Sequence, residues 1–336
     1  MTGRDSHYYH RLAEDALRGV PLGQADGVRL LQDDSLELLP LLQAAFRVRR
    51  HYFGRGVRVH ILNNVQNGYC PEDCHYCAQS ATSEAPIERY RAKDEEEILA
   101  DAGHACQAGA FRYCMVLSGR GPHPDRLTWM AGLVRRIKAR WPMEVCLSAG
   151  FIDQAMATTL KEAGLDRYNH NLNTAETHYG AICHTHTYRD RLATLQAARA
   201  AGLEVCSGLI VGMGESPADL WTVADALRQL QARSIPINFY VHVPGNRLGD
   251  VAHALTPEKC LRVLCLFRFL NPDAELRAAG GREVHLRSLS PLALYPANGL
   301  FSAGYLNVGG QSTEEVMRMI VDAGFTVEQV EEAKRE

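Results

Sequence analysis

Residues 57–77 read VRVHILNNVQNGYCPEDCHYC, and this stretch joins a strand-like run to a loop that carries three cysteines. Its first part, residues 57–62, is mostly apolar over six positions, which is typical of a short buried strand. Before it, apolar residues recur at helical spacing, and after it short strand-like runs alternate with longer helical ones. The character of the sequence therefore changes at Val57, and residues 57–62 are predicted to be the first strand of a repeating pattern.

The later strand-like segments are predicted at residues 113–118, 143–148, 167–172, 204–211, 236–242, 275–278 and 299–303. The amphipathic helices between them are predicted at 94–108, 125–140, 153–163, 188–200, 216–232, 256–270 and 312–323. Four of these helices end in an Ala-Gly pair, whose glycine can take the left-handed conformation that terminates a helix. The pairs are Ala108-Gly109, Ala163-Gly164, Ala201-Gly202 and Ala323-Gly324.

About eight strands that alternate with helices predict an α/β fold, a closed (βα)8 barrel of the TIM type. An open doubly wound sheet is the alternative, although no GxGxxG follows the first strand, which weakens its dinucleotide-binding version. Three parts are expected: an N-terminal helical extension over 1–55, the barrel over 56–310 and a C-terminal helical segment over 311–336. The pattern around Val20-Pro21-Leu22-Gly23 predicts a break within the N-terminal helices.

Composition narrows the class of protein. The 336 residues carry a net charge of −3, so no global positive field favours nucleic acid. No apolar run approaches the roughly 18 residues that a membrane-spanning helix needs, and the N-terminus lacks the apolar core of a secretory signal. We therefore expect a cytoplasmic protein without a membrane or nucleic-acid partner. In that compartment its 10 cysteines are expected to be ligands or core residues rather than disulfide partners.

Cys70, Cys74 and Cys77 have the spacing CxxxCxxC in the loop after the first strand. Three close thiolates suit a soft metal site, but a structural zinc site needs four ligands, commonly two paired knuckles. The chain has no second CxxC, and His75 would have to point away from an ion that Cys74 and Cys77 share. Three thiolates leave one iron of a four-iron cluster open for another ligand.

A CxxxCxxC loop after the first strand of a βα barrel resembles the radical S-adenosylmethionine (SAM) superfamily. Seven segments in order further resemble its biotin synthase family. They are CPEDCHYCAQS (70–80), APIERY (85–90), YNHNLNT (168–174), HTYRDRLATL (186–195), CSGLIVGMGE (206–215), SIPINF (234–239) and GGREVHLRSLSPLALYPAN (280–298). The resemblance runs from about residue 63 to residue 311 and implies that the open iron binds SAM, which an electron cleaves to methionine and a 5′-deoxyadenosyl radical.

The resemblance also implies the cluster ligands. It assigns a SAM-binding [4Fe-4S] cluster to Cys70, Cys74 and Cys77, with Tyr76 beside the adenine. It assigns an inner [2Fe-2S] cluster to Cys114, Cys146, Cys206 and Arg277. These last four lie in four different strand segments, and inward side chains of barrel strands form layers on the axis. The alternative is three buried cysteines that act as small hydrophobic residues.

A buried arginine needs an anionic partner, so Arg277 requires a cluster or a carboxylate. Glu275 is two residues away on the same face of the strand and is a competing structural partner. Arg112, two residues before Cys114, is expected on the same face as that cysteine, where it would tune the inner cluster.

Five more polar residues are assigned to SAM and the substrate by the resemblance: Asn169, Asn171, Asn173, Arg191 and Asn238. Asn169 and Asn171 are two apart on one strand and therefore share a face. The resemblance places Asn173 at the ribose and Arg191 at the SAM carboxylate, a role that suits a guanidinium fork. The alternative for Arg191 is an ordinary exposed helix arginine. Asn238 would recognise the ureido ring of the substrate.

The other cysteines, Cys106, Cys183, Cys260 and Cys265, are interpreted as structural. His178, His184 and His186 lie close in sequence, but outside any HExxH context a second metal there is the less favoured hypothesis. The chain departs from the family at Cys183, where relatives usually carry Thr. It departs again at residues 245–248, which read GNRL where the family usually has Gly-Thr-Pro-Leu.

The expected activity is sulfur insertion into dethiobiotin, with flavodoxin or ferredoxin as electron donor and a homodimer as assembly. One alternative is another radical SAM enzyme, a maturase or a mutase, in which the inner cysteines and Arg277 are not ligands. A non-enzymatic iron–sulfur carrier is disfavoured by polar residues inside barrel strands. A zinc-dependent hydrolase is disfavoured because the chain lacks a histidine-rich ligand set.

Overall fold

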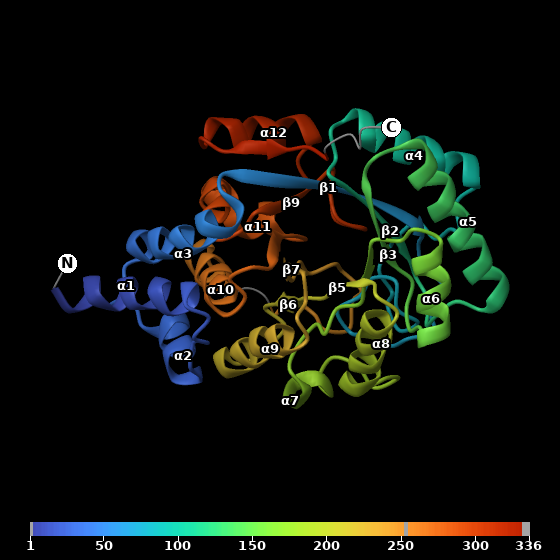
Figure 1. The fold of residues 1–336 in the computed structure, drawn as a ribbon. Coiled ribbons are helices and arrows are strands. Elements are labelled where there is room, and N and C mark those ends of the chain that lie inside the picture. The colour runs from blue at the N-terminus through green and yellow to red at the C-terminus, as the bar shows by residue number, and fades with distance from the viewer. Residues whose placement is uncertain (1–2, 252–254, 331–336) are drawn as a thin grey trace.

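The computed structural model describes residues 3–251 and 255–330 of the chain. Figure 1 shows a ring of strands surrounded by helices, with three N-terminal helices packed on one side. These helices are α1 (Gly3–Leu17), α2 (Gln24–Gln32) and α3 (Leu38–Phe53). The chain is not helical from residue 20 to residue 23, so the predicted break in this region is confirmed.

The barrel strands are β1 (Gly56–Gln66), β2 (Arg112–Leu117), β3 (Glu144–Ser148), β4 (Arg167–Asn169), β5 (Glu204–Cys206), β6 (Leu209–Val211), β7 (Ser234–Phe239), β8 (Glu275–Ala278) and β9 (Gly299–Ser302). They pair in parallel in the order β1-β2-β3-β4-β5-β7-β8-β9, with β6 also on β7. Pairing of β9 with β1, where Arg58 faces Gly299, closes the ring. The closed barrel is therefore confirmed, and the open doubly wound alternative is wrong.

The outer helices are α4 (Glu95–Gln107), α5 (Pro124–Arg140), α6 (Gln154–Glu162), α7 (Glu176–Tyr179), α8 (Tyr188–Ala200), α9 (Pro217–Gln229), α10 (Pro257–Leu270), α11 (Arg282–Leu286), the 3-10 helix η2 (Arg287–Leu294) and α12 (Thr313–Asp322). All seven predicted helices are present, and the short α7, α11 and η2 are additional. The glycines of the four Ala-Gly pairs have φ of 77°, 92°, 77° and 79°. Their predicted left-handed conformation is confirmed.

The predicted strand at 204–211 is wrong in one respect, because the chain forms two short strands with a break at Ser207 and Gly208. The cause is a close approach to the neighbouring strand. A Cβ atom on Gly208 would lie 1.8 Å from the carbonyl oxygen of Pro236. Together β5 and β6 occupy one of the eight positions in the ring, and the break leaves Cys206 at the end of β5.

The C-terminal segment contains a strand as well as the predicted helix. After α12, β10 (Thr326–Glu328) pairs in parallel with the start of β1, outside the barrel ring. Residues 1–2 and 331–336, which belong to the predicted terminal segments, lie outside the described residues. The division of the chain at residues 55/56 and 310/311 stays a prediction.

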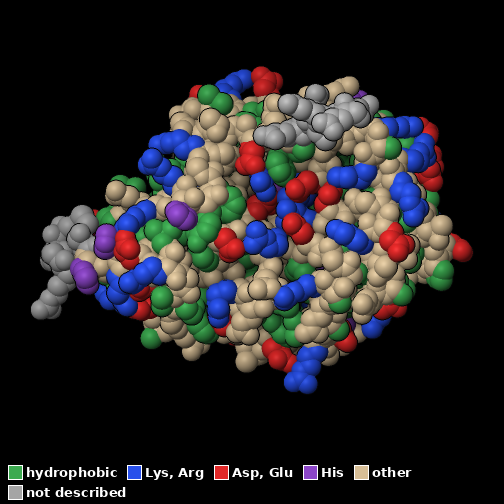
Figure 2. Space-filling model, viewed as in Figure 1, with side chains coloured by type: hydrophobic (Ala, Val, Ile, Leu, Met, Phe, Trp, Pro, Cys, Tyr) green, Lys and Arg blue, Asp and Glu red, His purple; other side chains and the backbone are tan. Residues whose placement is uncertain are grey.

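Two large apolar clusters fill the space between the strands and the outer helices. Helix α10 is buried on all sides from Cys260 to Leu270 because α2, α3 and α9 pack against it (Figure 1), and Cys260 and Cys265 are part of this core. Within the described ranges, no helix combines the length and apolar character needed to cross a lipid bilayer. Figure 2 shows acidic and basic side chains interspersed on one face, consistent with the small net charge.

Candidate active site

The cysteine loop leaves the carboxyl end of β1, the rim at which barrel enzymes carry their functional loops. Short-range backbone bonds shape it: the Cys77 N–H donates to the Cys74 carbonyl at 3.1 Å, and the Ser80 N–H donates to the Cys77 carbonyl at 3.2 Å. Cys74 is buried, whereas Cys70 and Cys77 are half-buried. Burial raises the pKa of the Cys77 thiol to about 11, so this thiol stays protonated until a metal displaces the proton.

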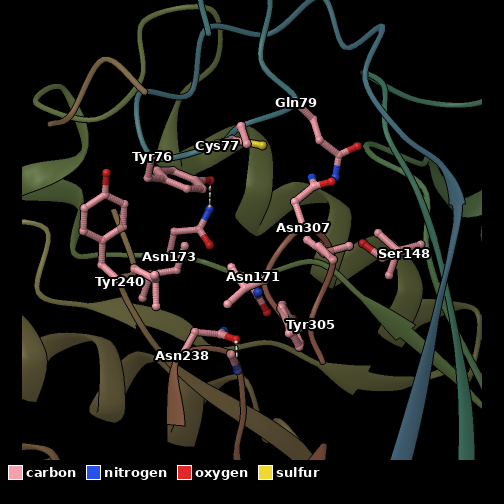
Figure 3. A pocket seen from close by; sticks show the side chains of 18 of the residues that line it. Tyr76, Cys77, Gln79, Ser148, Asn171, Asn173, Asn238, Tyr240, Tyr305 and Asn307 are labelled. Carbon is pink, nitrogen blue, oxygen red and sulfur yellow. Dashed lines mark hydrogen bonds between the residues drawn. The ribbon is translucent and has the colours of Figure 1, made fainter. Parts of the chain in front are cut away.

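A cavity of about 250 Å³ opens beneath this loop (Figure 3). It is lined by Tyr76 and Cys77 from the loop and by the predicted residues Asn169, Asn171, Asn173, Arg191 and Asn238. A smaller cavity of about 20 Å³ lies deeper, lined among others by Cys114, Cys146 and Arg277. Because Val116, Ser148, Asn169 and Tyr305 line both, the two cavities adjoin. The barrel thus places one loop cysteine and the inner cysteines at opposite ends of two adjoining cavities.

Tyr76 and Asn173 form the upper wall of the larger cavity, where the Asn173 side-chain amide donates to the Tyr76 hydroxyl (Figure 3). Asn173 has φ of 70°, a left-handed conformation that asparagine tolerates better than most residues. Its main chain bonds both Gly208 and Ile210, at 3.0 Å each. The broken strand therefore fixes the position of Asn173 beneath the cysteine loop.

Arg191 lies in the first turn of α8, which a capping box of Thr187 and Asp190 begins. Only 8% of the residue is exposed, so the alternative of an ordinary surface arginine is wrong. Its Nε donates to the Tyr179 hydroxyl, one Nη donates to the Asn171 carbonyl at 3.0 Å, and the other lies 2.9 Å from His186 Nε2. These contacts use three of its five N–H groups, so two remain for a ligand in the cavity.

The amides of Asn169 and Asn171 contact each other at 3.2 Å and both line the larger cavity. The predicted strand over 167–172 is wrong in its length, because β4 ends at Asn169 and Asn171 lies beyond it. Asn171 also accepts from the Gly208 N–H at 3.1 Å. Asn238 accepts from the Gly280 N–H and donates to the Leu209 carbonyl, both at 3.0 Å. These amides therefore join the carboxyl ends of neighbouring strands while they line the cavity. A role for Asn238 in binding the ureido ring stays a prediction.

The inner set meets at the narrow end of the interior, where Cys114, Cys146, Cys206 and Arg277 are each at most 4% exposed. Cys114 and Cys146 are direct partners in the β2–β3 register. The hydrogen bond from the Cys146 thiol lowers the pKa of Cys114, whereas burial raises the pKa of Cys206. Arg277 donates from one Nη to Cys206 Sγ at 2.5 Å. The four residues that the sequence places on separate strands are therefore neighbours.

The structure resolves which partner Glu275 takes. Arg112 donates to Glu275 at 2.6 and 3.0 Å and to Glu144 at 2.6 and 2.8 Å, and Ser234 donates to Glu275 at 2.6 Å. Arg277 Nε lies 3.7 Å from Glu275 and has no hydrogen-bond partner among the described residues. Glu275 therefore pairs with Arg112, and Arg277 faces the thiols.

This pairing also changes the interpretation of Arg112. The residue is fully buried near Cys114, as expected, but its guanidinium belongs to an ion-pair layer formed with Glu144 and Glu275. Arg167 bonds Glu144 at 3.2 Å, and His60 lies 3.7 Å from Glu275. Glu144, Arg167 and His60 were not predicted as part of the site, although each lies in a strand and is charged or ionisable.

The inner residues fit an iron–sulfur cluster by their chemistry. Three converging thiols are soft ligands, and an arginine with no carboxylate hydrogen bond requires negative charge nearby. The buried Arg277 Nε without a partner is the direct observation for this fit. The loop cysteines fit as well, since three thiols lie within one short loop above a cavity whose lining includes Arg191 and several asparagines.

The three histidines of the 178–186 segment do not converge. His178 Nε2 lies 3.1 Å from the Met213 carbonyl, His184 lies 3.2 Å from Asp73, and His186 Nδ1 lies 2.5 Å from Glu72. The hypothesis of a metal bound by all three is therefore not supported. Sequence reasoning missed a different contact, in which Cys183 Sγ lies 3.8 Å from Cys74 Sγ.

Hydrogen bonds to Asp73 connect the 178–186 segment to the cysteine loop. Burial disfavours its charge, but N–H donors from His184 and Thr185 at 3.0 and 3.1 Å outweigh burial and hold the pKa of the carboxyl below its ordinary range. On the other side of the loop, Asn246 donates to the Tyr76 carbonyl at 2.9 Å. The unusual residue of the GNRL segment thus supports the cysteine loop from outside.

Comparisons with known proteins agree with this geometry. Residues 64–227 match the family model of the Radical SAM superfamily, and residues 236–326 match the Biotin and Thiamin Synthesis associated domain. The chain is 64% identical to a biotin synthase of Magnetococcus marinus over 321 residues, which cover 96% of this chain and 100% of that protein. It is 54% identical to one of Acaryochloris marina, over 90% of this chain and 88% of that protein.

Solved structures share the fold at low identity. Methylornithine synthase aligns with a TM-score of 0.82 and 21% identity, over 95% of this chain and 97% of that one. The FeFe-hydrogenase maturase HydG from Carboxydothermus hydrogenoformans aligns with a TM-score of 0.78 and 16% identity, over 94% and 78%. These two likenesses concern the barrel alone, whereas the sequence identity to the bacterial relatives extends over nearly the whole chain. The chain belongs to the biotin synthase family of radical SAM enzymes.

Proposed function

We propose that this enzyme converts dethiobiotin to biotin, with SAM, a [4Fe-4S] cluster and an inner [2Fe-2S] cluster as cofactors. One observation carries the proposal: two adjoining cavities lead from Cys77 at the rim to Cys114, Cys146 and Arg277 on the barrel axis. A substrate in the larger cavity would lie between the two groups of cysteines. A maturase or mutase without sulfur donation has no need of the inner group.

Each group of residues has a proposed cofactor. Cys70, Cys74 and Cys77 would hold the SAM-binding cluster. Cys114, Cys146, Cys206 and Arg277 would hold the inner cluster. When bound, the [4Fe-4S] cluster would supply the electron that cleaves SAM to methionine and a 5′-deoxyadenosyl radical. The inner [2Fe-2S] cluster would supply the sulfur.

The remaining residues bind, orient and exclude water. The two free N–H groups of Arg191 are the proposed partners of the SAM carboxylate, a charge-assisted contact. The Tyr76–Asn173 pair would hold the adenosine portion beneath the loop. Asn238, fixed by two backbone bonds, would present its remaining N–H and lone pair to the ureido ring. Burial of the inner thiols keeps water from a reactive carbon centre.

Two partners complete the proposal. The family implies a redox partner, and a flavodoxin or ferredoxin is the proposed electron donor. A homodimer is the proposed assembly. Electron delivery by either donor is checked by SAM cleavage with the reduced donor as the sole reductant, and the dimer is checked by sedimentation.

The first experiment counts iron and sulfide per chain after anaerobic reconstitution and records the Mössbauer spectrum. Two distinct clusters with about six irons per chain are expected. About four irons in a single cluster would contradict the inner site and leave radical SAM chemistry without a sulfur donor. A turnover assay with dethiobiotin then tests the substrate.

A variant separates the inner cluster from the outer one. Cys146→Ala should lose the inner iron and biotin formation while it keeps the outer cluster. Cys265→Ala is the matched control, because it also removes a fully buried thiol but lies in α10, outside the cavities. If Cys146→Ala forms biotin as the control does, the assignment of the inner ligands is wrong.

A further inference from the structure

Cys74 and Cys183 form a thiol pair outside the two cavities. Their Sγ atoms lie 3.8 Å apart, and the two residues are 109 positions apart in the chain. Cys183 belongs to the loop between α7 and α8, and both cysteines are at most 7% exposed. Neither burial in an apolar core nor the proposed cofactors requires a second thiol at this position.

Backbone contacts on both sides hold the two segments together. The N–H of His75, one residue after Cys74, donates to the carbonyl of Ile182, one residue before Cys183, at 2.9 Å. The carboxylate of Asp73, one residue before Cys74, accepts from the N–H groups of His184 and Thr185, one and two residues after Cys183. The thiols are thus held opposite each other, and a disulfide would require the sulfurs to approach from 3.8 Å to roughly 2.05 Å.

A metal ion is the competing occupant, since two thiols at this spacing and the nearby His186 resemble three tetrahedral ligands. The contacts of His186 argue against it. Its Nε2 accepts a hydrogen bond from Arg191 at 2.9 Å, and its Nδ1 faces Glu72 at 2.5 Å. A cation would have to displace a buried guanidinium of like charge, so the ring lacks a free lone pair for a metal.

We propose that Cys74 and Cys183 form a disulfide when the chain carries no cluster, and that this bond withdraws Cys74 from cluster assembly. With a peroxide as oxidant, the two S–H bonds break and one S–S bond forms. Two electrons and two protons pass to the peroxide, whose O–O bond breaks to give two molecules of water from hydrogen peroxide, or one of water and one of alcohol from an alkyl hydroperoxide. A thiol reductant reverses the bond by exchange.

The consequence for assembly rests on the proposed function, because it requires Cys74 to be a cluster ligand. With Cys74 in a disulfide, only Cys70 and Cys77 of the loop would remain, and two ligands do not suffice to hold a four-iron cluster. A bound cluster in turn keeps Cys74 from reacting with Cys183. Oxidation would therefore act on the unloaded chain and be reversible.

The test maps disulfides in the full-length chain prepared without clusters and treated with hydrogen peroxide. Digestion with chymotrypsin and Glu-C together releases residues 73–76 (DCHY) and residues 180–188 (GAICHTHTY), each with one cysteine. The expected product is the linked pair of these two peptides, lighter than their sum by two hydrogen atoms and separated by reduction. In Cys183→Ser the linked pair should disappear. Its absence from the wild-type digest would overturn the inference and leave the proposed function intact.

The second readout is iron uptake at the outer site, measured in Cys146→Ala so that the inner site does not contribute. Oxidation before reconstitution should remove at least nine-tenths of the iron uptake, and a thiol reductant should restore it. The additional substitution Cys183→Ser should make uptake resistant to the same treatment. Unchanged uptake in a chain with a mapped Cys74–Cys183 disulfide would instead show that Cys74 is not a ligand, which contradicts the proposed function.

Discussion

Glu275→Gln tests the ion-pair layer beneath the inner thiols. Glu275 is 2% exposed and accepts two hydrogen bonds from Arg112, one from Ser234 and one from Arg58. Glutamine has nearly the same shape, but it removes the negative charge and turns an N–H donor toward groups that are themselves donors. The buried Arg112 then keeps only Glu144 as an anionic partner.

The expected loss follows from burial. Removal of one partner from a buried ion pair typically costs about 3–5 kcal/mol, because the other charge is left without compensation. We expect the free energy of unfolding to fall by about this amount at neutral pH. Glu314→Gln is the control, since Glu314 pairs with Arg318 at the surface and is 83% exposed. Its effect should stay within about 0.5 kcal/mol.

Urea unfolding of the cluster-free chain, followed by circular dichroism, measures both variants. The pH dependence gives a second check. Burial disfavours the charge of Glu275, but Arg112 outweighs burial and holds the pKa of the carboxyl well below its ordinary value of 4.5. A depressed pKa contributes stability that is fully present above the unfolded value and is lost as pH falls through the folded one. The difference between wild type and Glu275→Gln should therefore be constant from about pH 7 to about pH 5 and shrink only below about pH 4.5.

Two results would refute this reasoning. One is a loss below about 1 kcal/mol at neutral pH, the size of an exposed pair. The other is a difference that disappears between about pH 7 and about pH 5, because the pKa of Glu275 would then be raised above its ordinary value of 4.5 rather than lowered.

Three further variants test other parts of the site. Arg277→Met should weaken iron binding at the inner site by about 10–100-fold, measured by competition with a chelator, and wild-type affinity would exclude a role for Arg277 there. Arg191→Lys should raise the Kd of SAM by about tenfold or more, measured by equilibrium dialysis with the reconstituted enzyme, because lysine cannot form the fork; an unchanged Kd would place the carboxylate elsewhere. Gly208→Ala should yield little folded protein, since the new Cβ meets the Pro236 carbonyl, whereas Gly180→Ala meets nothing within 4 Å and should fold normally, as judged by soluble yield.

The barrel was predictable because its signals are local. Each strand and long helix is encoded in its own run of residues, and each Ala-Gly pair, such as Ala108-Gly109, ends a helix by its own backbone preference. The break in the predicted strand 204–211 was not predictable, because its cause is the Pro236 carbonyl on another strand. The strand β10 was not predicted either, because it is only three residues long and so short a run shows no recognisable alternation of apolar and polar residues.

Residue identities at the site followed from the resemblance, but the choice of partners did not. Arg112 and Arg277 are both on strands that could bring them to Glu275, and sequence spacing gave more weight to Arg277 because it is two residues away. Only the closed ring shows that Arg112, on β2, reaches across the axis to β8. The contact of Cys183 with Cys74 had no sequence signal either, since 109 residues separate them.

The ion-pair layer explains how Arg277 can face thiols in the centre of a protein. If Glu275 were free, the nearest anion would attract the Arg277 guanidinium toward the amino-terminal end of the barrel. Arg112 instead occupies both Glu275 oxygens, at 2.6 and 3.0 Å, and Arg277 is left with a sulfur acceptor at 2.5 Å. Neutral thiols do not balance its charge, whereas thiolates around a cluster would. The layer therefore keeps one buried positive charge available for the proposed inner cluster and fills that end of the barrel with side chains, which leaves the cavity beneath the cysteine loop as the place where the proposed SAM and substrate would bind.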